Sequence, residues 1–133
     1  MTDNVTHRDR STDLGVVRIN NEAITTIASI AAMEVKGVHK IGGGFKRTLG
    51  EFFLKRSGTG GVRISAKDNE IKLAVSIVVN YGIDIPRVAD GVQDSVKHAV
   101  ENMTGLIMSE VDVIVEGVYA QVYDKENKKG VAL

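Results

Sequence analysis

The sequence predicts an α+β protein in which one sheet carries two helices on one of its faces. Three observations lead to this prediction. Segments that alternate apolar and polar residues predict strands that are buried on one side only. Two segments with apolar residues three and four positions apart predict amphipathic helices. The order of these segments is strand, helix, strand, strand, helix, strand, which indicates a two-layer sandwich with a ferredoxin-like β-α-β-β-α-β arrangement.

The first strand is expected at residues 15–20, and the first helix begins after it. Asn20 or Asn21 is a suitable N-cap, and Gly37 suits the position just after a helix. Ile30 and Met33 lie off the main apolar face, so this helix either touches a neighbouring molecule there or sits in a deep cleft against the second helix. The residues of the main face are Ile24, Ile27, Ala28, Ala31, Val35 and Val38.

The middle of the chain predicts a β-hairpin. Residues 61–66 and 71–81 both alternate apolar and polar side chains, and the residues between them favour a turn. Right-handed crossovers would place the first and third strands side by side.

The second helix and the last strand complete the expected fold. Asp84 is a suitable N-cap, Pro86 is acceptable in a first turn, and Gly105 ends the helix. Its apolar stripe runs from Val88 to Met103. The last strand is expected at residues 111–123, where Gly117 marks a bulge because the alternation changes phase there.

We therefore expect one domain at residues 14–123 with a disordered tail at 1–13 and a polar tail at 124–133. A Gly-rich and Phe-rich insertion at 38–61 is long for a loop in a small domain. It holds all three Phe and carries a charge of +4, although the net charge of the whole chain is zero.

This basic insertion supplies the candidate partner-binding residues. Three interpretations stay open: a short helix folded back on the core, a docking surface for a protein partner or another subunit, and an amphipathic basic helix lying on anionic lipid. The candidate residues are Phe45, Lys46, Arg47, Leu49, Phe52, Phe53, Lys55 and Arg56.

Composition and motifs argue against several functions. With no Cys there are no disulfides, Cys-ligated metals or thiol nucleophiles, and no nucleotide-binding or hydrolase motif occurs. We therefore expect no enzyme activity, no cofactor and no metal. The stretch at 58–61 matches the G-x-x-G of KH domains, but a strand follows it, and the exposed hairpin face has no aromatic residue. A small nucleic-acid-binding module that uses 38–61 is kept as the alternative. No leader or membrane-spanning segment is expected, which favours a cytoplasmic protein.

Two blocks of the sequence resemble the alkaline shock protein family of small envelope stress response proteins. The first is GVVRINNEAITTIASIAAMEVKGV at 15–38, with a G-x-V-x-I-like strand and an I-x-x-I-A-x-x-A-A helix. The second is NYGIDIPRVADGVQDSVKHAVENMTGLIMSEVDVIVEGV at 80–118, with a Y-G-x-x-I-P turn, a T-G-L stop and a V-x-V-x-V-x-G-V strand.

The resemblance implies a non-catalytic cytoplasmic protein of the envelope stress response that self-associates as a homo-oligomer and acts as a scaffold. In some members a separate membrane-embedded anchor protein holds the protein at the inner face of the membrane, and others are linked to fatty-acid or lipid metabolism. The family has no established catalytic residues. Ile30 and Met33 are then candidates for self-association, and the insertion is the candidate contact for the anchor or for lipid.

Overall fold

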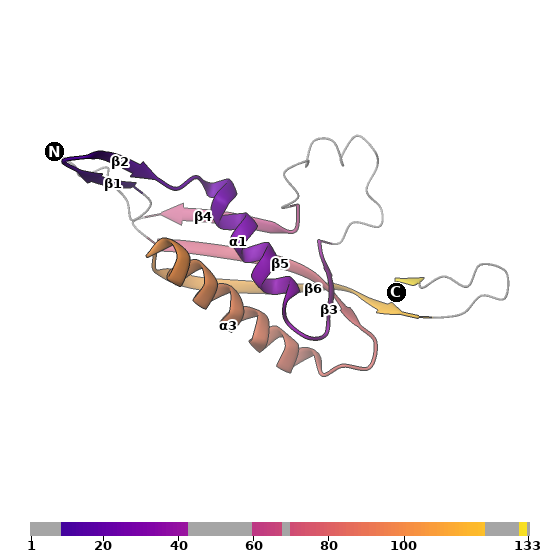
Figure 1. Ribbon diagram of the computed structural model, residues 1–133. Helices are drawn as coiled ribbons and strands as arrows, with labels where there is room; N and C mark the ends of the chain where they lie inside the picture. The colour runs from indigo at the N-terminus through magenta and orange to yellow at the C-terminus, as the bar shows by residue number, and fades with distance from the viewer. Residues whose placement is uncertain (1–8, 43–59, 68–69, 122–130, 133) are drawn as a thin grey trace, which may run out of the picture.

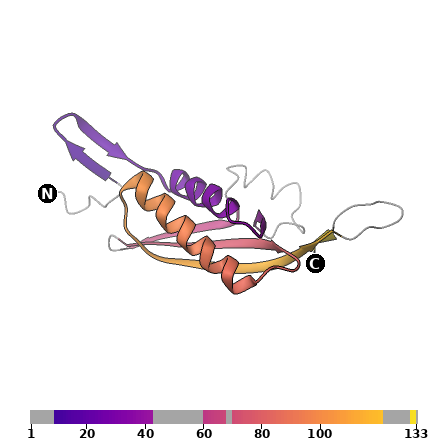
Figure 2. The ribbon, with the colours of Figure 1, turned by 60° about the horizontal axis from the view of Figure 1, so that its bottom comes forward.

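The computed structural model describes residues 9–42, 60–67, 70–121 and 131–132. Two helices lie on the same face of a sheet, so the body has two layers (Figures 1 and 2). This confirms the predicted α+β class and the placement of the helices. The elements are β1 (Asp9–Thr12), β2 (Gly15–Arg18), α1 (Asn21–Met33), β3 (Val38–Ile41), β4 (Val62–Lys67), β5 (Glu70–Asn80), α3 (Ile85–Thr104), β6 (Met108–Ala120) and β7 (Val131–Ala132).

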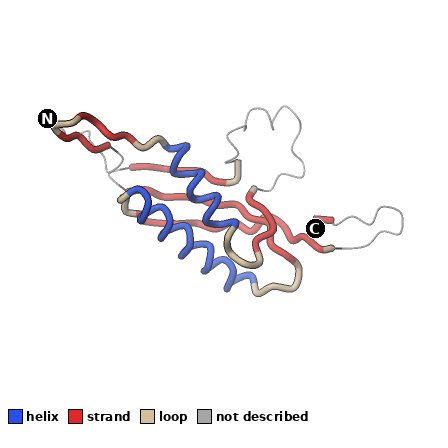
Figure 3. The backbone as a smooth tube through the Cα atoms, viewed as in Figure 1, coloured by secondary structure: helices blue, strands red, loops and turns tan. Residues whose placement is uncertain are grey.

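β5 is the central strand of the main sheet (Figure 3). On one side β6 runs parallel to it, and β7 pairs antiparallel with the end of β6. On the other side β3 and β4 both pair antiparallel with β5, β4 along its first part and β3 near its end. β3 and β4 thus form one edge of the sheet.

The first predicted strand does not join this sheet, so its expected place beside the third strand was wrong. β2 pairs with β1 in a separate two-stranded sheet, Thr12 opposite Gly15. The turn between them is stabilised locally, because the backbone N–H of Leu14 donates to Oγ1 of Thr12 at 3.1 Å. Pairing with β1 therefore replaces the expected pairing in the main sheet, and residues 9–12, expected in the tail, form a strand.

The expected insertion at 38–61 begins with a strand. Residues 38–41 form β3, and Gly42 and Gly61 then meet at the same residue of β5: the Gly42 N–H donates to the Ser76 carbonyl and the Ser76 N–H to the Gly61 carbonyl, both at 2.7 Å. A side chain on Gly61 would overlap the backbone of Gly42. The candidate Phe and basic residues of 45–56 lie outside the described residues.

Helix α1 is shorter than the apolar spacing predicted. It ends at Met33, and the N–H groups of the next residues turn back onto the last helical carbonyls. Gly37, with φ of 106°, then turns the chain into β3, so Val38 belongs to a strand and not to the helix. The buried residues of α1 are Ile24, Thr25, Ala28, Ala31 and Ala32.

Helix α3 follows the prediction closely. The Asp84 side chain accepts from the Arg87 N–H, and Gly105 ends the helix in the left-handed conformation. Its buried residues are four valines at 88, 92, 96 and 100. Met103, expected in this stripe, is 71% exposed because the stripe has passed the end of the sheet contact by that turn.

The core lies between the helices and one face of the sheet. Leu73, Val75 and Ile77 of β5 point into it, and alternate residues of β4 and β6 flank them. The two helices also contact each other, and the Ser95 hydroxyl donates to the Ala31 carbonyl at 2.9 Å. One buried layer therefore anchors both helices to three strands.

The predicted bulge in the last strand is present. Ile77 pairs with Val115 and Val78 with Gly117, so one extra residue stands in β6 at that point. The bulge keeps Val118 on the core side and turns Tyr119 to the other face.

Residues 131–132, expected in a polar tail, pair with β6 as β7. Among the described residues no helix has the length and apolar character needed to cross a membrane.

Candidate interaction site

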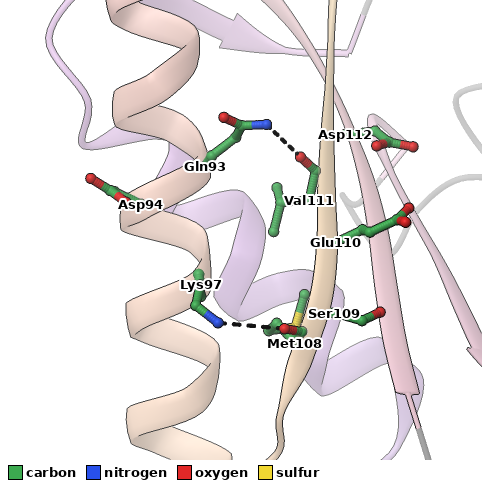
Figure 4. Close-up of a pocket in the computed structure, with 8 residues that line it drawn as sticks. All are labelled: Gln93, Asp94, Lys97, Met108, Ser109, Glu110, Val111 and Asp112. Carbon is green, nitrogen blue, oxygen red and sulfur yellow. Dashed lines mark hydrogen bonds between the residues drawn. The ribbon is translucent and has the colours of Figure 1, made fainter.

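The most open part of the described body is the outer edge of β6. β7 covers only Tyr119 and Ala120, so Met108–Val118 has no strand partner on that side within the described ranges. A groove of about 380 Å³ runs between this edge and α3 (Figure 4). Its lining residues are Gln93, Asp94, Lys97, Met108, Ser109, Glu110, Val111 and Asp112.

Two side chains of α3 in this groove bond to backbone carbonyls of β6. The Gln93 amide donates to the Val111 carbonyl at 2.9 Å, and the Lys97 ammonium lies 3.4 Å from the Met108 carbonyl (Figure 4). Both carbonyls belong to the outer edge of β6, where a neighbouring strand would otherwise bond. Side chains of α3 therefore partly cover a strand edge, as proteins often do to limit edge pairing.

Glu101 fastens the end of α3 to the start of β6. Its carboxylate accepts from the Met108 N–H at 3.0 Å and from the Lys97 ammonium at 2.9 Å. The backbone hydrogen bond, and after it the Lys97 ammonium, lower the pKa of Glu101 below its ordinary value, because both stabilise the charged carboxylate. Glu101 therefore joins α3 to the first residue of β6.

The face of the sheet without helices has an uneven charge. Glu110 and Asp112 are exposed on the β6 side, and Arg63 is exposed on the β4 side. Lys72 on β5 lies 3.8 Å from Glu110, which is the distance of a loose surface ion pair. The β6 edge is thus acidic, whereas the opposite edge carries a cation.

His39 and Tyr119 stack on this same face. Their ring centroids are 3.8 Å apart with the rings within 4° of parallel. They come from β3 and β6, which flank β5, so the stack crosses β5 near Val78. Val78 is fully buried although it belongs to the helix-free face and not to the main core. The sequence did not indicate the pair because His39 stood in an expected loop, although the phase change at Gly117 already placed Tyr119 on the face opposite Val118.

Of the candidate residues from the sequence, the structure describes Ile30 and Met33. They are 57% and 45% exposed, so they do not fill a cleft against α3. Both side chains are open to solvent on α1, and their role in self-association stays a prediction. Within residues 9–42, 60–67, 70–121 and 131–132, no cluster of His, Asp and Glu is arranged to hold a metal ion.

Comparison with known families gives one clear match. The profile of the alkaline shock protein family, described as having a cell envelope-related function, matches residues 9–120. This range begins at β1 and ends with β6, so it covers both the hairpin and the two-layer body. The resemblance carried by the two sequence blocks is confirmed.

Individual relatives agree with this match. The chain is 38% identical over 112 residues to the uncharacterized protein YqhY of Bacillus subtilis, covering 84% of this chain and 82% of that one. It is 32% identical over 109 residues to YloU of the same organism, covering 80% and 91%. Spy1535 of Streptococcus pyogenes is 28% identical over 117 residues, covering 87% and 88%.

Solved structures resemble the fold only distantly. A chain named MamM-CTD 215-293 has a TM-score of 0.45 and 18% identity, covering 73% of this chain and 98% of that one. A likeness at this level carries no argument about function.

Proposed function

Because the chain belongs to the alkaline shock protein family of cell envelope-related proteins, we propose that it serves the envelope as a non-enzymatic interaction module. In this proposal it self-associates as a scaffold in the cytoplasm and is held at the inner face of the membrane by a separate membrane-embedded partner. The observation that carries the proposal is the long edge of β6, which lacks a strand partner in the described chain, beside a groove in which Gln93 and Lys97 bond to edge carbonyls of β6. Such a surface suits a protein contact better than a reaction.

The exposed apolar side of α1 supports the same function. Ile30 and Met33 lie one helical turn apart and are both open to solvent. A pair of exposed apolar residues on one helix face offers a contact for another protein surface. We assign them to self-association and keep the membrane partner for the basic segment at 45–56.

The alternative, a nucleic-acid module, has weaker support from the described residues. Glu110 and Asp112 place negative charge on the helix-free face, which would repel a phosphate backbone. The His39–Tyr119 rings are stacked on each other, so neither presents two free faces to a base. Retention on a heparin column at physiological salt would revive this alternative.

Two measurements on the full chain test the proposal. Light scattering over a hundredfold concentration range should show a mass that rises with concentration, because self-association follows mass action. Sedimentation with native membranes should recover the protein and a membrane-embedded protein together. A monomer at every concentration, together with no membrane recovery, would refute the proposal.

Variants assign the contacts. Ile30→Glu with Met33→Glu should lower the assembled fraction, whereas Met103→Glu with Ile107→Glu, which changes apolar residues that are even more exposed, should not. Phe52→Glu with Phe53→Glu should reduce membrane recovery while the domain stays folded. If recovery is unchanged in a folded variant, the basic segment is not the membrane contact.

A further inference from the structure

The two outer edges of the main sheet have complementary properties. On one side stands the β6 edge, acidic on its helix-free face and bordered by the groove under α3. On the other stands the β4 edge, with Arg63 exposed on the same face and no ion pair for it among the described residues. No strand in the described chain pairs with the outside of β4.

We propose that the outer edge of β6 in one copy takes the outer edge of β4 in a second copy as its next strand. Copies then join head to tail through a continuous sheet, with the helices of every copy on the same face. This inference rests on the proposed self-association and adds two strand edges to the surfaces that carry it.

Strand direction fits this contact. Within one copy, β4 is antiparallel to β5 and β6 is parallel to β5, so β4 and β6 run in opposite directions. A second copy that is shifted sideways in the same orientation therefore presents its β4 antiparallel to β6 of the first copy. β7 already shows that the outside of β6 accepts an antiparallel strand, since Val131 and Ala132 pair there with Ala120 and Tyr119. The same shift brings α1 of the second copy beside α3, because α1 lies on the β4 side and α3 on the β6 side (Figures 1 and 2).

The outward peptide groups of β4 can be identified from its ladder with β5. The Gly61 carbonyl accepts the Ser76 N–H at 2.7 Å, so Gly61, just before β4, bonds inward. Inward and outward residues alternate along a strand. The outward residues of β4 are therefore Val62, Ile64 and Ala66.

The β6 edge offers a matching set. The Val111 carbonyl faces outward, where it accepts from Gln93, and the next outward residues are Val113 and Val115. All three side chains lie on the helix-covered side of the sheet, as do those of Val62 and Ile64. An antiparallel register that sets Ile64 of the second copy opposite Val111 also sets Val62 opposite Val113, so two apolar pairs form on the helix-covered face.

Charge favours this pairing over the symmetric one. With Ile64 of the second copy opposite Val111, Arg63 of the second copy stands opposite Asp112 on the helix-free face, a favourable cross-strand pair. Two copies of β6 paired with each other would instead bring Glu110 and Asp112 of both copies together. Like charges across a strand pair are destabilising, so the β4 edge is the better partner.

In this register the bond from Gln93 to Val111 is an interaction of the single chain that the added strand has to share or replace. A carbonyl oxygen has two lone pairs, so it can accept from both. Gln93→Ala removes the competitor, and we expect it to lower the concentration at which assembly occurs. A higher concentration requirement in this variant would count against the edge contact.

Charge reversal tests the proposal on the full chain. Arg63→Glu and Asp112→Arg should each raise the concentration for half-assembly about tenfold, on the order of 1.4 kcal/mol of lost contact energy. The two variants mixed in equal amounts should assemble, and so should the double variant. In the mixture the native Asp112 edge of one variant meets the native Arg63 edge of the other, and the two reversed edges also carry opposite charges. Arg87→Glu, an exposed reversal at the start of α3, is the control and should have no effect.

A backbone variant separates edge pairing from a general charge effect. Ala66→Pro removes an outward N–H while leaving the β4–β5 ladder intact, so it should abolish assembly in a folded protein. Ala66→Ser keeps the N–H and should assemble as the wild type does. Circular dichroism and urea denaturation establish that each variant is folded.

The outcomes distinguish the two proposals. If the wild type assembles and neither Arg63→Glu nor Ala66→Pro weakens assembly, the edge contact is refuted while self-association stands. If Asp112→Arg strengthens assembly and Arg63→Glu has no effect, β6 pairs with itself and the head-to-tail contact is wrong. If the wild type stays monomeric, self-association itself fails and the edge contact fails with it.

Discussion

The two faces of the main sheet use alternate residues of the same strands and differ in what covers them. Leu73, Val75 and Ile77 of β5 are buried under α1 and α3, whereas Lys72 and Ser76, which alternate with them along the strand, lie on the other face. The covered face holds the helices in place, and the helix-free face keeps its charges in water. A protein built this way gains stability from one face and has the other face and the edges available for contacts.

Val78 departs from this division. It is fully buried on the helix-free face, near the stacked His39 and Tyr119 rings, and it is not part of the main core. The helix-free face therefore has a small ordered cluster of its own at the end where β3 pairs with β5.

The largest difference in stability between the two faces should come from substitutions at two adjacent residues of β5. Leu73→Ala should lower the free energy of unfolding by about 2–5 kcal/mol, because it leaves a cavity under the helices. Lys72→Ala, one residue away on the other face, should cost less than about 1 kcal/mol, the range of an exposed ion pair. Urea denaturation of both variants gives the comparison. Equal losses would mean that the helix-free face is covered as well.

Two glycines test how tightly the helix layer packs on the turn before β3. Gly37 and Gly82 both have positive φ, 106° and 96°, so Ala at either position costs about 1–3 kcal/mol in backbone strain. A Cβ at Gly37 would also lie 2.7 Å from Val88 Cγ2, whereas one at Gly82 meets no atom within 4 Å. Gly37→Ala should therefore have the lower melting temperature of the two. The reverse order would show that α3 shifts easily at Val88.

Val78 and the exposed Ile114 allow a second comparison of stability, this time within the helix-free face. Val78→Ala should lower the free energy of unfolding by about 2 kcal/mol, since two buried methyl groups are lost. Ile114→Ala, on the same face but exposed, should lower it by less than about 1 kcal/mol. Denaturation curves that show no difference between these variants would remove Val78 from the ordered part of the fold.

The smallest effect concerns Glu101 at the border between α3 and β6. Its lowered pKa means that the folded state favours the charged carboxylate, so its contribution is present above the unfolded pKa of about 4.3 and is lost as pH falls through the folded value. The stability difference between the wild type and Glu101→Gln should therefore be largest at neutral pH and shrink below about pH 4. A difference that is constant from pH 7 to pH 3 would contradict this role of the carboxylate.

Periodicity predicted the covered face well, because burial under a helix imposes a strict pattern on both partners. The valines of α3, the alternation of β5 and the bulge at Gly117 all appear where the sequence placed them. Asp84 and Gly105 also bound α3 as expected, since cap positions have specific chemistry.

Strand partners were harder to predict, because alternation fixes the face of a strand and not its neighbour. β2 has the pattern of a sheet strand, yet β1 pairs with it across a short turn. The four residues of β3 are too few for a clear pattern, so they were expected in the insertion. The open edge of β6 likewise has no sequence signal, since it depends on which strands reach the sheet.

The meeting of Gly42 and Gly61 at Ser76 has a consequence for how this domain can change. Gly42 and Gly61 lie next to each other at Ser76, so the described fold does not fix the number of residues that join them. Doubling the length of such a segment costs only about 0.6 kcal/mol in closure entropy. The length of this segment can therefore change between versions of the domain without refolding the body beside it.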